Sequence, residues 1–251
     1  MSSQAAGPFG SGPSRPNGDR RVALTGPASE RAAKRWIDAV YTVPGWKPLH
    51  FPLVKIVAKA IPKARVGLLP TFVAVTSQNA LPALKRLWDS RTDVRESKHA
   101  AVGVATARAM RALGIDPAIV VPPGDEGAKV LAEKLIAATD AGQTVLWPRG
   151  DRANDLREYL VIAGRQVEDP IAYRTEDLEG SVLPKQLNAA FFASPSAVSV
   201  WLRTPDTPRV TAIAIGQTTH AELAPEYARF SRIVRLAQPS PKALSETLAG
   251  L

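Results

Sequence analysis

Residues 72–81 read Phe-Val-Ala-Val-Thr-Ser-Gln-Asn-Ala-Leu, and residues 190–198 read Ala-Phe-Phe-Ala-Ser-Pro-Ser-Ala-Val. Each segment has a short apolar run, then small polar residues, then the first residues of a helical pattern. Such a continuous apolar run is typical of a parallel strand that is covered on both faces. Ser77 aligns with Ser194 when the two segments are superposed. The pair therefore predicts a strand–turn–helix unit that is used twice.

The internal similarity continues along the chain and indicates two similar halves. Three further pairs of segments match: residues 101–106 with 214–219, 119–122 with 234–239, and 145–150 with 22–27. The last pair is out of order, because its second member lies at the start of the chain. Four similarities in one circular order favour a repeated fold over coincidence.

Strand-like and helix-like segments alternate over most of the chain. Short runs rich in Val, Ile, Ala and Phe predict strands at residues 22–25, 72–76, 100–104, 119–121, 145–147, 190–193, 212–215 and 233–236. Helical periodicity predicts helices at residues 80–88, 106–113, 128–139, 154–163 and 241–248. The expected class is α/β with open parallel sheets.

The circular order predicts two α/β domains, one inserted into the other. The first is discontinuous and comprises residues 20–46 and 177–251, whereas the second is a continuous insertion at residues 55–165. The chain must then cross between the domains twice, at residues 47–54 and 166–176. Both crossings look extended and contain Pro, which favours a two-stranded β-ladder linker over central strands. We therefore expect two open parallel-sheet α/β domains joined by this ladder.

The composition excludes several kinds of chemistry. The 251 residues include no Cys, so disulfides, thiolate metal sites and cysteine nucleophiles are excluded. The three His residues lack metal-ligand spacing. Neither a glycine-rich nucleotide motif nor a nucleophile elbow is present. We expect no metal and no cofactor, so an enzyme of this kind must bind and orient a reactive substrate.

The net charge of +9, with a pI near 10.0, favours an anionic partner. Basic residues are dispersed and are not interleaved with aromatic residues, which disfavours nucleic acid. No apolar run is long enough to cross a membrane. Residues 1–19, rich in Ser, Gly and Pro, predict a flexible tail without a secretory signal. The expected compartment is the cytoplasm, and we expect a monomer because nothing in the sequence demands a partner subunit.

Small polar residues follow the predicted strands at their carboxyl ends, where open parallel sheets bind ligands. Each turn precedes a helix, whose N-terminal N–H groups and partial positive charge favour carboxylates or phosphates. The alternative is that Ser77, Thr106, Ser194 and Thr219 only cap helices, which contributes about 0.5–2 kcal/mol each. The two roles can coexist. Two domains with facing turns would suit a ligand that carries many carboxylates.

Six short motifs occur in a fixed order along the chain. They are Val-Thr-Ser-x-Asn-Ala at residues 75–80, Ala-Val-Gly-x-x-Thr-Ala at 101–107, Leu-x-Pro-Arg-Gly-x-x-x-x-x-Leu at 146–156, Ala-Tyr-Arg-Thr at 172–175, Phe-Phe-x-Ser-Pro-Ser-Ala-Val at 191–198 and Ala-Ile-Gly-x-Thr-Thr at 214–219. Together they resemble the uroporphyrinogen-III synthase family over roughly residues 21–250. Each motif alone is short, but their joint order is specific.

The resemblance implies a substrate, a reaction and a set of site residues. The implied substrate is hydroxymethylbilane, a linear tetrapyrrole with eight carboxylates, and a transient contact with hydroxymethylbilane synthase is also expected. Loss of the terminal hydroxyl, attack through the substituted carbon of the last ring and a spiro intermediate would lead to the type III isomer. Without an enzyme, the bilane closes to the type I isomer. The protein would steer this reaction by positioning and by stabilising developing charge.

Among the implied site residues, Tyr173 is the catalytic candidate, because the family's linker tyrosine is thought to assist departure of the hydroxyl. The alternative for this side chain is packing within the ladder. The implied substrate-binding residues, acting largely through backbone N–H groups, are Thr25, Ser77, Asn79, Gly103, Thr106, Arg149, Ser194, Ser196, Gly216, Thr218 and Thr219.

The chain departs from the family pattern at the end of its first strand. The family usually has Thr-Arg-Pro there, whereas residues 25–27 read Thr-Gly-Pro. Any role of that arginine is missing or supplied elsewhere, for example by Arg149. Two other functions stay open: a non-catalytic tetrapyrrole or anion sensor of the same fold, and a solute receptor, which would require export. Since only two crossings join the predicted domains, we also expect hinge motion.

Overall fold

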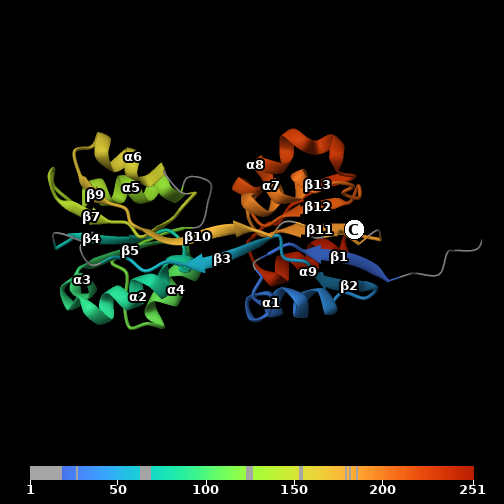
Figure 1. Ribbon diagram of the computed structural model, residues 1–251, viewed down its shortest axis with the longest axis horizontal. Coiled ribbons are helices and arrows are strands. Elements are labelled where there is room, and N and C mark those ends of the chain that lie inside the picture. The colour runs from blue at the N-terminus through green and yellow to red at the C-terminus, as the bar shows by residue number, and fades with distance from the viewer. Residues whose placement is uncertain are drawn as a thin grey trace, which may run out of the picture.

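The structure is a computed structural model that describes residues 19–26, 28–62, 69–122, 127–152, 155–178, 180, 182–184 and 186–251. Of the predicted tail, only Asp19 lies within these residues. The described chain forms three sheets, which we call A, B and C (Figure 1). Sheets A and C are five-stranded and parallel, and the three-stranded sheet B runs from one to the other.

Sheet A combines strands from both ends of the chain, in the order β13-β12-β11-β1-β2. Helices α1 and α9 cover one face and α7 and α8 cover the other (Figure 1). Both faces are therefore buried, which explains the continuous apolar runs. The elements are β1 (Arg20–Leu24), α1 (Glu30–Tyr41), β2 (Trp46–His50), β11 (Ala189–Phe192), α7 (Pro195–Arg203), β12 (Thr211–Ala214), α8 (Gln217–Leu223), η3 (Ala224–Arg229), β13 (Arg232–Arg235) and α9 (Pro241–Ala249).

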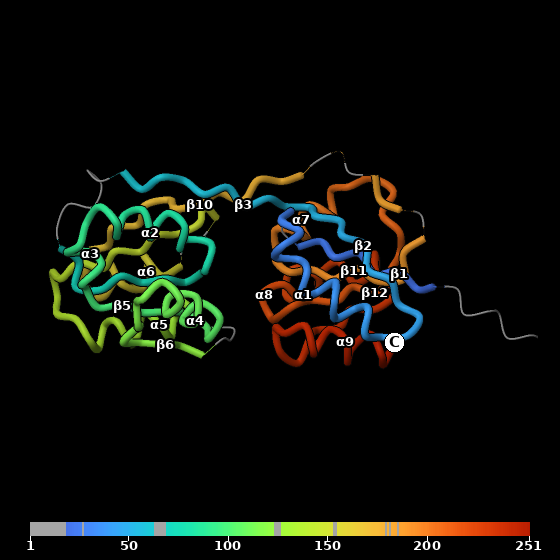
Figure 2. Tube along the Cα trace, turned by 90° about the horizontal axis from the view of Figure 1, so that it is seen from below, coloured from blue at the N-terminus to red at the C-terminus, as the bar shows by residue number. Residues whose placement is uncertain are grey.

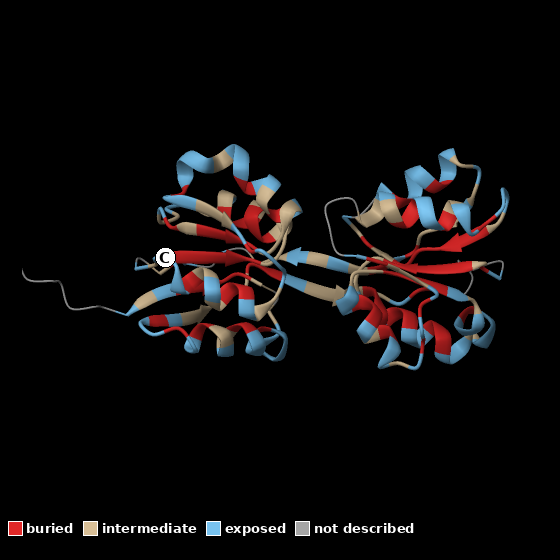
Figure 3. Ribbon diagram, turned by 180° about the vertical axis from the view of Figure 1, so that it is seen from behind, coloured by how far each residue is buried: buried red, intermediate tan, exposed pale blue. Residues whose placement is uncertain are grey.

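Sheet C is built from the middle of the chain, in the order β6-β5-β4-β7-β9. Helices α2, α3 and α4 share one core with it, and α5 and α6 share another on the opposite face. The elements are β4 (Phe72–Val75), η2 (Gln78–Ala80), α2 (Leu81–Ser90), α3 (Thr92–Glu96), β5 (Lys98–Val102), α4 (Val104–Arg111), β6 (Ile119–Val121), α5 (Gly127–Ala137), β7 (Thr144–Leu146), α6 (Asp155–Ile162) and β9 (Gln166–Glu168). Figure 3 shows the buried residues gathered between each sheet and its helices.

Mixed α/β architecture with parallel sheets is confirmed, and each predicted strand is present with its ends displaced by at most two residues. The helix predicted at residues 80–88 instead begins with the short turn η2. Ser77 caps that turn by accepting a hydrogen bond from the Asn79 N–H at 3.2 Å. Asn154, the first residue of another predicted helix, lies outside the described residues.

Sheet B joins β3 (Val54–Ala58) and β10 (Ile171–Asp177) as an antiparallel pair, with β8 (Arg149–Gly150) parallel to β10. In Figure 2 this sheet runs along one edge of the molecule, and the layers around sheets A and C lie on the same side of it. Figure 3 shows that β3 and β10 are less buried than the central strands of the two larger sheets, such as β4 and β11.

The predicted ladder strands are displaced in the structure. In the crossing predicted at residues 47–54, residues 47–50 form most of β2, which pairs with β1 at the edge of sheet A, and residue 54 begins β3. Residues 166–168 likewise form β9 at the edge of sheet C. In each crossing the chain changes sheets near a proline, Pro52 or Pro170. Each of these prolines lies between the last residue of one strand and the first residue of the next.

Candidate functional site

A pocket of about 740 Å³, the central pocket, lies over sheet B between sheets A and C. On the sheet A side its walls come from α1, the residues after β11 and β12, and the start of α7. On the sheet C side they come from η2, α2 and the residues around β8. The lining residues are Ala32, Arg35, Trp36, Val54, Ile56, Ala58, Gln78, Asn79, Pro82, Gly150, Arg152, Tyr173, Thr175, Ala193, Ser194, Ser196 and Ile215.

One face of sheet B forms the floor of this pocket. Val54, Ile56 and Ala58 alternate along β3, so they lie on the same face of the strand. The register pairs Tyr173 with Ala58 and Thr175 with Ile56. Residues directly opposite each other in a ladder share a face. The floor therefore combines apolar side chains of β3 with a phenol and a hydroxyl of β10.

Tyr173 packs directly against the backbone of Gly150. A Cβ atom on residue 150 would lie 2.7 Å from Cζ of the tyrosine ring and 2.8 Å from its hydroxyl oxygen. Any side chain at this position would therefore push the ring away. Within the described ranges, the Tyr173 hydroxyl has no hydrogen-bond partner. It can consequently donate to a group that enters the pocket.

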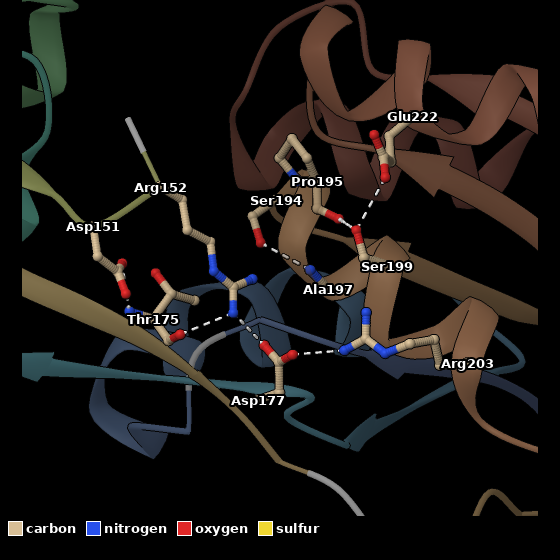
Figure 4. Close-up of polar contacts among 10 residues, drawn as sticks. All are labelled: Asp151, Arg152, Thr175, Asp177, Ser194, Pro195, Ala197, Ser199, Arg203 and Glu222. Carbon is tan, nitrogen blue, oxygen red and sulfur yellow. Dashed lines mark hydrogen bonds and ion pairs between the residues drawn. The ribbon is translucent and has the colours of Figure 1, made fainter. Parts of the chain in front are cut away.

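The turn after β11 supplies two lining serines. Ser194 has extended backbone dihedrals and caps α7, accepting a hydrogen bond from the Ala197 N–H at 3.3 Å (Figure 4). Ser196 lies in the first turn of the same helix. Pro195 has no N–H, and the Ala197 and Val198 N–H groups bond to Ser194, so the Ser196 N–H is the donor that the first turn of α7 leaves for an anion in the pocket.

Four of the predicted site residues meet in the central pocket: Tyr173, Asn79, Ser194 and Ser196. The structure places the others outside its lining. Thr25 is fully buried and its hydroxyl donates to the Phe191 carbonyl at 2.9 Å, so this side chain belongs to the fold. Thr106 and Thr219 are also buried. Ser77, Gly103, Gly216 and Thr218 lie at helix starts or in the first turn of a helix.

Arg149 was a candidate to replace the missing arginine, but it faces away from the pocket. Its Nε donates to Asp169 Oδ2 at 2.8 Å, and its side chain is only 17% exposed. It directly precedes Gly150, which does line the pocket. Since neighbouring residues of a strand point to opposite faces, Arg149 points to the other side of sheet B.

Two arginines that the sequence motifs did not single out line the pocket: Arg35 on α1 and Arg152 beyond β8. Arg152 donates to Asp177 Oδ1 at 2.6 Å, and Arg203 of α7 donates to Asp177 Oδ2 at 2.6 Å (Figure 4). Arg152 also donates to the Thr175 carbonyl at 2.9 Å. Its sequence signal was its place just beyond the Pro-Arg-Gly motif. Arg35 had no such signal in the sequence, because the periodicity of apolar residues in a helix does not tell which side of α1 faces the other sheet.

The central pocket is lined by two arginines and no carboxylate, whereas each of two other pockets in the described part of the chain is lined by one arginine and one aspartate. A larger one of about 950 Å³ lies beside the end of α7, but none of the predicted site residues lines it. In the described part of the chain, no group of three or more His, Asp or Glu side chains is placed to hold a metal ion. No helix among these residues is long and apolar enough to span a membrane.

Fold and pocket together define a class: an α/β protein whose two parallel sheets flank a pocket suited to an anionic small molecule. The family model described as Uroporphyrinogen-III synthase HemD matches residues 38–246. The chain belongs to the uroporphyrinogen-III synthase family, and this membership gives it a synthase function in tetrapyrrole biosynthesis.

Solved structures of similar fold include two of TM-score above 0.6. A mutant uroporphyrinogen III synthase from Thermus thermophilus is 18% identical, with a TM-score of 0.62 over 91% of this chain and 97% of that one. Uroporphyrinogen-III synthetase from Helicobacter pylori is 15% identical, with a TM-score of 0.63 over 92% of this chain and 100% of that one. At these identities the similarity shows the fold alone. Among curated protein sequences, none matches this chain.

Proposed function

We propose that this chain converts hydroxymethylbilane into uroporphyrinogen III, inverting the terminal pyrrole and releasing water, which makes it a hydro-lyase. One observation carries the proposal beyond family membership: the central pocket contains two arginines and, among the residues described, no carboxylate in its lining. A substrate with eight carboxylates suits such a pocket, because guanidinium groups and helix N-termini both stabilise carboxylates.

The pocket's shape supports catalysis by positioning. Trp36, Pro82 and the apolar residues of β3 give flat and apolar surfaces on which pyrrole rings can lie, while the polar residues stand at other points of the lining. A bilane held at several points cannot close freely. Its last ring must therefore react in the geometry that the pocket imposes, which favours one isomer.

Tyr173 is the proposed catalytic residue. In the proposed step the C–O bond to the terminal hydroxyl breaks while electrons from the pyrrole nitrogen form the exocyclic double bond of an azafulvene. The leaving oxygen takes the Tyr173 phenol proton and departs as water, and the phenolate regains a proton from the pyrrole N–H. The phenol of Tyr173 would donate its hydrogen bond to that oxygen as charge develops on it. Its place on the floor and its lack of a partner within the described chain support this role.

The organisation into two domains is part of the same proposal. Sheet A with its helices would form one domain, sheet C with its helices the other, and β3 and β10 the linker. The topology supports this, since the two five-stranded sheets are separate and sheet B joins them. A monomeric state, a cytoplasmic location and transient contact with hydroxymethylbilane synthase stay predictions.

A coupled assay tests the function. Porphobilinogen and hydroxymethylbilane synthase generate the bilane, this protein is added, and the oxidised products are separated by isomer. We expect mostly type III product. Only type I product with tight bilane binding would favour a sensor of the same fold. Only type I product without binding would refute the proposed function.

A further inference from the structure

The two arginines of the central pocket differ in how their charge is compensated. Arg152 pairs with Asp177, whose second oxygen pairs with Arg203. Arg35 has no ion pair or hydrogen bond with any residue in the described ranges. Arg35 is therefore the lining arginine whose charge no described carboxylate offsets, whereas Arg152 shares one carboxylate with Arg203.

The surroundings of Arg35 explain why it stays uncompensated. Asp38, one turn further along α1, binds Lys34 through both oxygens, at 2.8 and 3.0 Å. The positions four residues before and after Arg35 are Arg31 and Ala39, and neither can pair with it. The Arg35 guanidinium lies 5.3 Å from the centroid of the Trp36 ring, which also lines the pocket.

We infer that Arg35 binds a carboxylate of the substrate and is a main electrostatic anchor of the sheet A side of the pocket. This inference rests on the proposed function. A guanidinium presents parallel N–H donors that match a carboxylate, and it keeps its charge throughout the physiological pH range. The neighbouring Trp36 ring offers an apolar surface to the pyrrole that bears this carboxylate. The bound carboxylate would supply the negative charge opposite Arg35 that no residue of α1 provides.

Arg31 provides a matched control for this inference. It lies one turn before Arg35 on the same helix and is exposed, but it does not line the pocket. Replacing either arginine by Gln removes the same charge from the same helix. A general loss of electrostatic attraction would affect both variants alike, whereas a carboxylate contact would affect Arg35→Gln alone.

The test measures binding of uroporphyrin III, the oxidised product, by fluorescence titration, and the KM for the bilane in the coupled assay. We expect Arg35→Gln to raise the Kd and KM about tenfold or more, with a smaller change in kcat. Arg35→Lys should recover part of this loss, and Arg31→Gln should behave as wild type. Thermal unfolding of each variant checks that the fold is intact.

The outcomes separate this inference from the proposed function. Wild-type affinity in Arg35→Gln, together with type III product from the wild type, would overturn the Arg35 assignment and leave the function standing. Equal losses in Arg35→Gln and Arg31→Gln would also overturn it. If the wild type made only type I product, the function would fail, and the porphyrin titration would still decide whether Arg35 binds carboxylates.

Discussion

At the scale of single residues, the position of Tyr173 depends on a missing side chain. Gly150 leaves room for the ring, which fills the space that a Cβ atom would need. The Pro-Arg-Gly motif therefore has a steric reason for its glycine. Both residues come from sheet B, so the phenol is held by the ladder itself.

We predict that Tyr173→Phe lowers kcat roughly 100-fold while leaving KM and thermal stability close to wild type. The physical reason is that only the hydroxyl is removed, and it bonds to no residue that the structure describes. Steady-state kinetics in the coupled assay measures the effect. Tyr227→Phe, at an exposed site, serves as the control. Full activity in Tyr173→Phe would remove the hydroxyl from the mechanism.

His99 shows how burial changes a titration. It is 3% exposed on β5, its ring meets the Trp88 ring edge-on at 5.3 Å, and its Nε2 has no partner within the described chain. Desolvation by burial lowers the pKa of His99 to about 4, from 6.5. Between these values the unfolded chain binds a proton that the folded chain excludes.

We therefore predict that His99 destabilises the fold as the pH falls from 6.5 towards 4, by up to about 1.4 kcal/mol per pH unit. Above pH 6.5 the imidazole is neutral in both states and adds no pH dependence. Denaturant unfolding at several pH values should show a weaker acid dependence in His99→Leu than in the wild type. His220→Gln is the control. An identical acid dependence in His99→Leu would contradict the prediction.

At the scale of elements, two helices start in the same way. Ser194 begins α7 and Ser240 begins α9, each followed by Pro and each accepting a hydrogen bond from the N–H three residues on. Proline suits the first helical position because its φ is already helical and no N–H is needed there. Only the α7 start lines the central pocket. Comparing variants at Ser194 and Ser240 therefore distinguishes a loss of helix capping, which both variants would show, from a loss of ligand binding, which only the Ser194 variant would show.

We predict that Ser194→Ala and Ser240→Ala each lower the free energy of unfolding by about 1 kcal/mol, because each removes one cap. Only Ser194→Ala should also raise the KM for the bilane. Denaturant unfolding and the coupled assay measure the two effects. An unchanged KM in Ser194→Ala would mean that this hydroxyl serves the helix alone.

At the scale of the whole molecule, Asp177 connects the two larger sheets electrostatically. It lies at the end of β10 and binds Arg152, beyond β8, and Arg203, at the end of α7 (Figure 4). Both arginines are about half exposed, so each pair alone stabilises little. Their joint effect is to link the sheet A side to the sheet C side.

We predict that Asp177→Asn broadens the range of overall shapes, seen as a larger radius of gyration in small-angle X-ray scattering without ligand. Losing the carboxylate leaves two neighbouring guanidinium groups that repel each other. High salt should reduce the difference, because it screens charges near the surface. Asp38→Asn, which breaks a pair inside α1, is the control. Superimposable scattering curves would refute the prediction.

Much of the fold could be read from local pattern. Continuous apolar runs identified the strands of sheets A and C, because parallel strands covered on both faces show no alternation. The two segments that cross between the larger sheets were harder to predict from the sequence. Each supplies strands to two sheets, and the change of partner near Pro52 and Pro170 depends on which strand is nearby.

The candidate site likewise includes features that the sequence identified and features that only the tertiary structure revealed. The sequence by itself determined the family, the strand–turn–helix units and the candidate Tyr173, because these follow from residue order. Only the tertiary structure decided that Thr25 is buried, that Arg149 points away and that Arg35 lines the pocket. The physical reason is that a side chain's surroundings depend on strand register and helix packing. Both are set by contacts between segments far apart in the chain.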